Sequence, residues 1–131
     1  MAAFSNYLEN QLLNHTLRNT AYTAPATLYL ALFTSAGSLA ELEAGTLTHE
    51  LTGGSYARQT ITFNAAASGS TANSAIVTFS ALPAATVNFV AVMDASTAGN
   101  VLYFAQMSSS AALTSGDSYQ ISAGGLTIQL D

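Results

Sequence analysis

The chain has 131 residues, of which half are apolar and 7% are charged, with two arginines, seven acidic residues and a net charge of −5. This composition excludes a basic stripe for nucleic acid, a disulfide framework and a membrane-spanning helix, because lysine and cysteine are absent and the longest run of large apolar residues is 28–33. Ordinary soluble domains carry roughly 25% charged residues, so we expect hydroxyl side chains or neighbouring subunits to cover much of the surface.

The first twenty residues predict one amphipathic helix, because their large apolar residues repeat every four positions. Ser5 or Asn6 can cap its first turn, and Arg18 lies near its carboxyl end. We expect the helix to finish before Pro25, because proline disfavours helical geometry in the residue ahead of it. The apolar stripe of this helix consists of Phe4, Leu8 and Leu12.

Beyond Pro25 the apolar pattern changes to a period of two, which predicts strands. We expect about seven strands, at 27–34, 56–63, 73–79, 87–94, 101–107, 118–121 and 126–130. Residues 87–93 are apolar on both sides, as in a central strand or one covered by another subunit. The sequence thus predicts a mainly β fold: a single domain over 1–131, with a β-sandwich or barrel-like body of about seven antiparallel strands and one N-terminal α-helix.

Residues 35–54 form the longest connection and hold three of the seven acidic residues. Connections of this length usually have a function or are ordered by a neighbour. We expect a short helical or extended turn within this loop, and we expect its glutamates to face water. The β-rich body then comprises 55–131 together with the strand at 27–34.

No pattern in the chain indicates a catalytic, cofactor or metal site. His15 and His49 have no second ligand or nucleophile at a suitable spacing. A hydrolase that uses the acids of the 35–54 loop stays as a third alternative, although few aromatic residues lie nearby to line a sugar cleft. We therefore expect a protein that is not an enzyme and that binds no cofactor or metal.

The two arginines are candidates for contacts between subunits, because each must face water or find one of few acids. Arg58 lies on a predicted strand, where its guanidinium can make a bidentate bond to a carboxylate on another strand or another chain. An ion pair between subunits is a hypothesis for Arg18 or Arg58; the alternatives are a helix-capping contact at Arg18 and an exposed strand position at Arg58. Sheet edges are commonly protected by lysine or proline, which this chain nearly lacks. We expect the N-terminal helix or a neighbouring subunit to cover the strands at 87–93 and 101–107.

Several segments carry a resemblance to a known family: 5–10 (SNYLEN), 15–22, Pro25 with 28–34 (LYLALFT), 53–59 (GGSYARQ), 73–75, 94–95, 115–117 and 126–131. Together they resemble small tailed-bacteriophage virion proteins, which are often labelled tail-fibre-like; similar small β proteins serve as capsid cement or decoration. The resemblance implies a structural component of the particle, without enzyme activity or catalytic residues.

Our leading hypothesis is a capsid cement or decoration protein on the capsid exterior, which bridges subunits of the major capsid protein and contacts copies of itself as a homotrimer. The alternative is a tail or tail-fibre component that contacts other tail proteins or a host surface glycan. Neither hypothesis involves nucleic acid or a membrane. For the helix stripe, core packing is the competing interpretation. The candidate interface residues are Phe4, Leu8, Leu12, Arg18, Tyr56 and Arg58.

Overall fold

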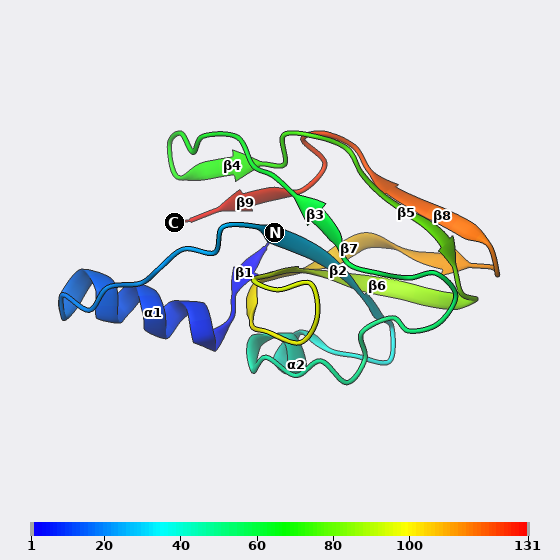
Figure 1. Ribbon diagram of the computed structural model, residues 1–131, viewed down its shortest axis with the longest axis horizontal. Helices are drawn as coiled ribbons and strands as arrows, with labels where there is room; N and C mark the ends of the chain where they lie inside the picture. Colours follow the sequence, from blue (N-terminus) through cyan, green and yellow to red (C-terminus); the bar gives the residue numbers. More distant parts are fainter. Residues whose placement is uncertain (1, 131) are drawn as a thin grey trace.

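The computed structural model describes residues 2–130, and antiparallel strands are its main secondary structure (Figure 1). A five-stranded sheet forms one layer, in the order β1-β7-β6-β2-β3. Two separate two-stranded ribbons, β4 with β9 and β5 with β8, form the second layer. The predicted mainly β domain with one N-terminal helix is confirmed, and within residues 2–130 the strands form an open sandwich and no closed barrel.

The elements have the following bounds, in chain order. They are β1 (Ala3–Phe4), α1 (Asn6–Leu17), β2 (Leu28–Thr34), α2 (Leu39–Glu43), β3 (Gln59–Ile61), β4 (Ser70–Ala72), β5 (Val77–Leu82), β6 (Ala85–Met93), β7 (Val101–Leu113), β8 (Asp117–Ile121) and β9 (Thr127–Gln129).

The central strands of the sheet are buried on both faces. Alternating side chains of β2 and β6 point into the space between the layers, where Leu32 and Val92 pack with Phe79 of β5. The intervening residues, such as Phe33, point to the opposite face and pack under Leu42 of α2. The apolar pattern at 87–93 therefore belongs to a central strand, because β6 lies between β7 and β2.

Short strands, and not the expected helix or second subunit, cover parts of the two edges of this sheet. At one edge, β1 has two residues and pairs with β7 only at Tyr103 and Phe104, so within residues 2–130 the rest of β7, 105–113, stays open on that side. At the other edge, β3 has three residues. Very short edge strands leave little backbone for another chain to pair with. The short strand β3 thus protects one edge, whereas the other edge is open along most of β7.

The strand predictions differ from the structure at several boundaries. The strand expected at 56–63 is only Gln59–Ile61, because Tyr56 and Arg58 use their side chains to anchor an irregular segment. The strand expected at 73–79 begins at Val77, and β4 precedes it. The strand expected at 101–107 continues to Leu113. Neither β1 nor β4 was predicted.

Most residues of the 35–54 loop face water, as predicted, and Glu43 is among them, but Leu42, Glu50 and Leu51 turn inward. The expected short turn is the helix α2, which a capping box between Ser38 and Glu41 closes. Leu42 and Leu51 are each 2% exposed: Leu42 packs with Phe33 on the outer face of the sheet, and Leu51 packs in the core between the layers. Glu50 is also drawn inward, because it forms an isolated antiparallel bridge with Phe33 of β2. The loop is part of the packed body.

Candidate functional site

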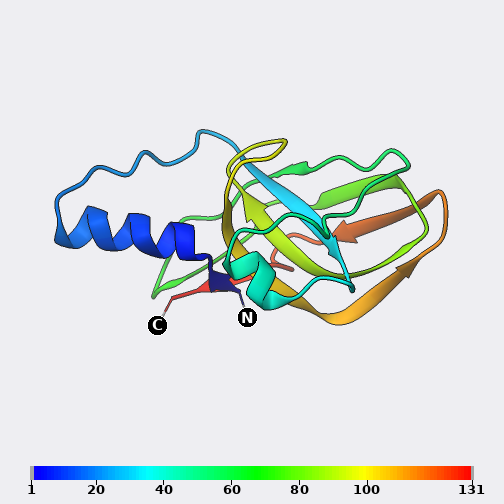
Figure 2. The ribbon, with the colours of Figure 1, turned by 90° about the horizontal axis from the view of Figure 1, so that it is seen from below.

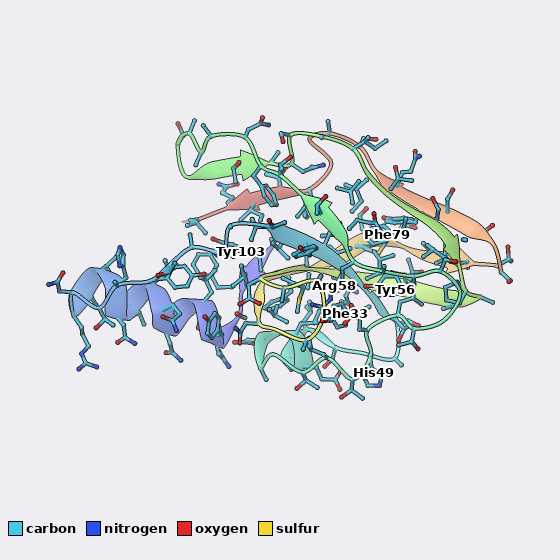
Figure 3. The ribbon with its side chains drawn as sticks, viewed as in Figure 1. Phe33, His49, Tyr56, Arg58, Phe79 and Tyr103 are labelled. Carbon is cyan, nitrogen blue, oxygen red and sulfur yellow. The ribbon has the colours of Figure 1, made fainter. Side chains whose placement is uncertain are left out.

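A cluster around Arg58 joins segments that are distant in the sequence (Figure 3). The Arg58 side chain is 3% exposed and contacts both carboxylate oxygens of Glu50: Nε donates to Oε1 at 2.8 Å and Nη2 donates to Oε2 at 2.7 Å. Its Nη1 donates to the carbonyl oxygens of Ala95 at 2.8 Å and Ala98 at 2.7 Å. One guanidinium thus holds the 35–54 loop against the turn between β6 and β7.

Tyr56 completes this cluster from the interior. Its hydroxyl donates to Glu50 Oε1 at 2.8 Å and accepts from the backbone N–H of Leu32 at 3.1 Å. Its ring stacks on Phe79, with the ring centroids 6.0 Å apart. Burial raises the pKa of Tyr56 well above its usual range, and the bond to Glu50 raises the pKa of Arg58. Both groups therefore keep their protons near neutral pH, so Tyr56 is neutral and Arg58 is positively charged.

The chemistry of the cluster is that of a clamp. Its polar side chains are bonded to one another, which fixes their positions. A hollow of about 370 Å³ lies beside it, between Glu50, Tyr56, Arg58 and the turn residues 96–98. The predicted bidentate bond of Arg58 to a carboxylate is confirmed, and its partner Glu50 lies in the same chain; the alternative of an exposed strand position is wrong.

The same turn is held by its own polar residues. Asp94 Oδ1 accepts from the backbone N–H of Asn100 at 2.7 Å, and Oδ2 accepts from the Asn100 amide at 2.8 Å. With the carbonyls of Ala95 and Ala98 bound by Arg58, the turn has a defined shape at the surface.

The N-terminal helix is a projecting arm, which we define as residues 6–27 (Figure 2). Ser5 caps α1, as predicted: its hydroxyl oxygen accepts from the backbone N–H of Leu8 at 3.2 Å, and the hydroxyl also bonds the Val101 carbonyl. Ser5 is 0% exposed, which fixes the base of the arm in the body. Beyond this base the helix extends away from the two layers.

The predicted helix stripe faces the body. Phe4 lies in β1 and meets Tyr103 edge-on, with centroids 5.1 Å apart. Leu8 is 3% exposed and Leu12 is half-buried. Whether any stripe residue also meets a partner stays a prediction. Arg18 is the exposed C-cap residue, and its backbone N–H donates to the Asn14 carbonyl at 3.1 Å.

Sequence reasoning left two other helix residues out of the candidate interface. Leu13 is 55% exposed and Leu17 is 76% exposed, and they lie one turn apart on the side of α1 away from Leu8. Their four-residue spacing was a visible signal in the sequence. Only the structure shows that this spacing marks a solvent-facing stripe.

The two histidines lie apart from the Arg58 cluster. His49 Nδ1 lies 3.1 Å from Glu41 Oε2, and His15 Nδ1 lies 3.3 Å from the Thr20 carbonyl oxygen. Among residues 2–130, no three side chains of histidine, aspartate or glutamate gather in a way that could hold a metal ion. The part of the chain that is described also has no helix long and apolar enough to cross a bilayer.

Comparison with known proteins supplies the family. A family model described as Podophage GP4 fiber I protein gp80 matches residues 3–129, which is nearly the whole chain. The search of curated proteins finds no match.

Proposed function

This chain belongs to the Podophage GP4 fiber I protein gp80 family, and from that premise we propose that it is a structural subunit of the phage tail fibre. The predicted resemblance to phage virion structural proteins is confirmed, and the chain is a phage structural protein of the fibre type. The family favours the tail-fibre alternative over our leading hypothesis of a capsid cement protein. The match over residues 3–129 is the observation that carries the proposal.

The internal design of the body suits a structural role that involves no catalysis. Fibre subunits must keep their shape under mechanical load, and the body is braced by a buried ion pair between Arg58 and Glu50. A second brace is Asn73, which is 0% exposed and whose amide bonds to backbone groups of Ala75, Ser122 and Leu126. These polar groups form fixed internal connections.

The projecting arm supports self-association of the fibre subunit. A twelve-residue helix is marginal in water by itself and usually owes its stability to packing. Here only Leu8 of α1 is buried, while Leu13 and Leu17 face solvent. Asn6 and Asn10 lie on the same side of the helix, and Glu9, one turn before Leu13, is the charged residue at the margin of the stripe. Burial of Leu13 and Leu17 against identical copies would favour association, and we propose homotrimers as the stoichiometry to test.

Locating the chain in the virion tests the fibre proposal. Immunogold labelling or a cryo-EM map of purified particles should place the chain on the tail, and quantitative mass spectrometry should give a copy number comparable with other tail proteins. Signal over the capsid shell, with a copy number approaching that of the major capsid protein, would overturn the proposal and restore the cement hypothesis.

A double variant of the arm tests self-association. At a protein concentration low enough for the parent to be monomeric, Leu13→Gln with Leu17→Gln should leave the free energy of unfolding within about 0.5 kcal/mol of the parent value, because both side chains of the single chain face solvent. The same variant should sediment as a smaller species than the parent chain. His15→Gln, at an exposed position on the opposite side of the helix, is the matched control and should sediment as the parent does. Identical sedimentation of all three proteins would contradict the role of the arm.

A further inference from the structure

We propose that a hollow on the open side of the sandwich binds an uncharged saccharide. The hollow has a volume of about 480 Å³ and lies between β7 and the segment that runs from β8 to β9. Its size falls within the range of roughly 300–1,000 Å³ that is usual for small-molecule sites. The inference rests on the proposed fibre function, because a fibre subunit at the virion surface is placed to meet host glycans.

The topology explains why the sandwich is open here. Strand β7 belongs to the five-stranded sheet, whereas β8 pairs with β5 and β9 pairs with β4, so no ladder joins β7 to β8 or β9 within residues 2–130. A large bulge widens the opening, because Val87 pairs with Ala111 but Phe89 pairs with Gln106. Four residues of β7, 107–110, thus lie opposite the single residue Asn88, and such an insertion bends the strand.

The chemistry of the lining selects the class of ligand. None of the residues that line the hollow is charged. Apolar side chains from both layers form part of it: Ala2, Val90, Ala105, Met107, Ile121 and Leu126. The half-buried ring of Tyr119 adds an aromatic surface next to the core, against which the C–H face of a sugar ring can pack.

Uncharged polar groups contribute the rest of the lining. They come from Gln106, Ser108, Ser109, Tyr119, Gln120, Ser122 and Thr127. Within residues 2–130, none of these side chains forms a hydrogen bond with another protein group. The side-chain hydrogen bonds are at the helix caps, the Arg58 cluster, Asn73 and the turns. Hydroxyl and amide groups both donate and accept, which matches the paired donor and acceptor character of sugar hydroxyls.

Two other classes of ligand fit less well. An acidic saccharide or a phosphate would find no cation in the lining and would approach a chain of net charge −5. A partner strand added to the edge of β7 would need evenly spaced backbone donors and acceptors, and the bulge at 107–110 interrupts that spacing. A neutral saccharide needs neither a cation nor a regular edge.

Saccharide titration of the ¹⁵N-labelled full chain, followed by two-dimensional NMR, tests the site. The probes are neutral monosaccharides and disaccharides of glucose, galactose, mannose and N-acetylglucosamine, with glucuronic and sialic acids as charged comparisons. At about 20 mM, well above the millimolar dissociation constants of weak sites, at least one neutral probe should shift amides of 105–109 and 119–127. The acidic probes should produce no such shifts.

Variants of the lining residues test whether the saccharide binds in this hollow. Ser108→Ala with Ser109→Ala removes two exposed hydroxyls and should weaken binding about 10-fold without loss of stability. Ser110→Ala is the matched control, because Ser110 is exposed on the same strand and lies outside the lining. It should bind as the parent does.

Three results would overturn the inference. They are the absence of shifts with every neutral probe, binding of the acidic probes in their place, and shifts of β7 amides that depend on protein concentration without saccharide. The last result would mean that this edge pairs with another copy of the chain. A tail location in the virion without saccharide binding would refute this inference alone, whereas a capsid location would refute the fibre function.

Discussion

Replacing Arg58 should destabilise the protein more than any change at the other arginine. Arg58→Met keeps much of the side-chain volume but removes four hydrogen bonds, two to Glu50 and one each to the carbonyls of Ala95 and Ala98. The Glu50 side chain is only 16% exposed and would lose its counter-charge. Breaking a buried ion pair from one side typically costs about 3–5 kcal/mol.

The magnitude is large relative to the whole stability of a domain. Domains of this kind are stable by about 5–15 kcal/mol. For a chain of this length each kcal/mol corresponds to roughly 3–5 °C in Tm, so Arg58→Met should lower Tm by about 10–20 °C. Urea unfolding followed by circular dichroism measures the free-energy difference directly.

Two comparisons separate the ion pair from other effects of the substitution. Arg18→Met removes the only other arginine, at an exposed C-cap, and should change the free energy of unfolding by less than about 0.5 kcal/mol. In a double-mutant cycle, Glu50→Gln with Arg58→Met should cost less than the sum of the single changes, by roughly 1–3 kcal/mol. The clamp should also slow hydrogen exchange in the 94–100 turn of the parent chain.

The reasoning would be refuted if Arg58→Met lowered the free energy of unfolding by less than about 1 kcal/mol, or by no more than Arg18→Met does. A buried carboxylate that loses its partner should destabilise the fold by more than that. Additive single and double changes in the cycle would likewise show that the contact between the two side chains carries no energy of its own.

Three further changes test other parts of the structure. The Asn73 amide donates to two carbonyl oxygens at 2.9 Å each, and Asn73→Asp would place a carboxylate against them. This change should lower the free energy of unfolding by roughly 2–3 kcal/mol in urea titrations. A loss under about 0.5 kcal/mol would contradict this expectation. Because the pKa of Tyr56 is higher in the folded than in the unfolded chain, its contribution is complete below pH 10 and is lost as pH rises further. Stability should therefore decline above pH 10, and less steeply in Tyr56→Phe; equal slopes would count against the buried hydroxyl. Ser5→Ala removes the helix cap and should cost about 1–2 kcal/mol, with faster hydrogen exchange in α1; unchanged exchange there would show that the cap does not anchor the arm.

Features that depend on near neighbours in the chain could be predicted from the sequence. The start of α1 follows from Ser5 and the four-residue spacing of Phe4, Leu8 and Leu12, because capping and helix faces involve residues three or four apart. The burial of β6 on both faces follows from its unbroken apolar pattern. The mainly β class follows from the period of two beyond Pro25.

Very short strands could not be predicted, because two or three residues show no period. Strand β1 exists only because β7 offers it backbone partners at Tyr103 and Phe104, about a hundred residues later in the chain. The bulge in β7 likewise could not be predicted, because it depends on which residues of β6 pair with β7. No local pattern marks either feature.

The sequence by itself determined the class of fold, the capped helix, the central strand and a resemblance to phage virion proteins that the family match confirms. The tertiary structure alone decided which acid Arg58 would pair with, which side of α1 would face solvent, and where the sandwich would stay open. The physical reason is distance along the chain. Arg58 meets the Ala98 carbonyl across 40 positions and Asn73 meets Leu126 across 53, and such contacts form only after the whole chain has packed.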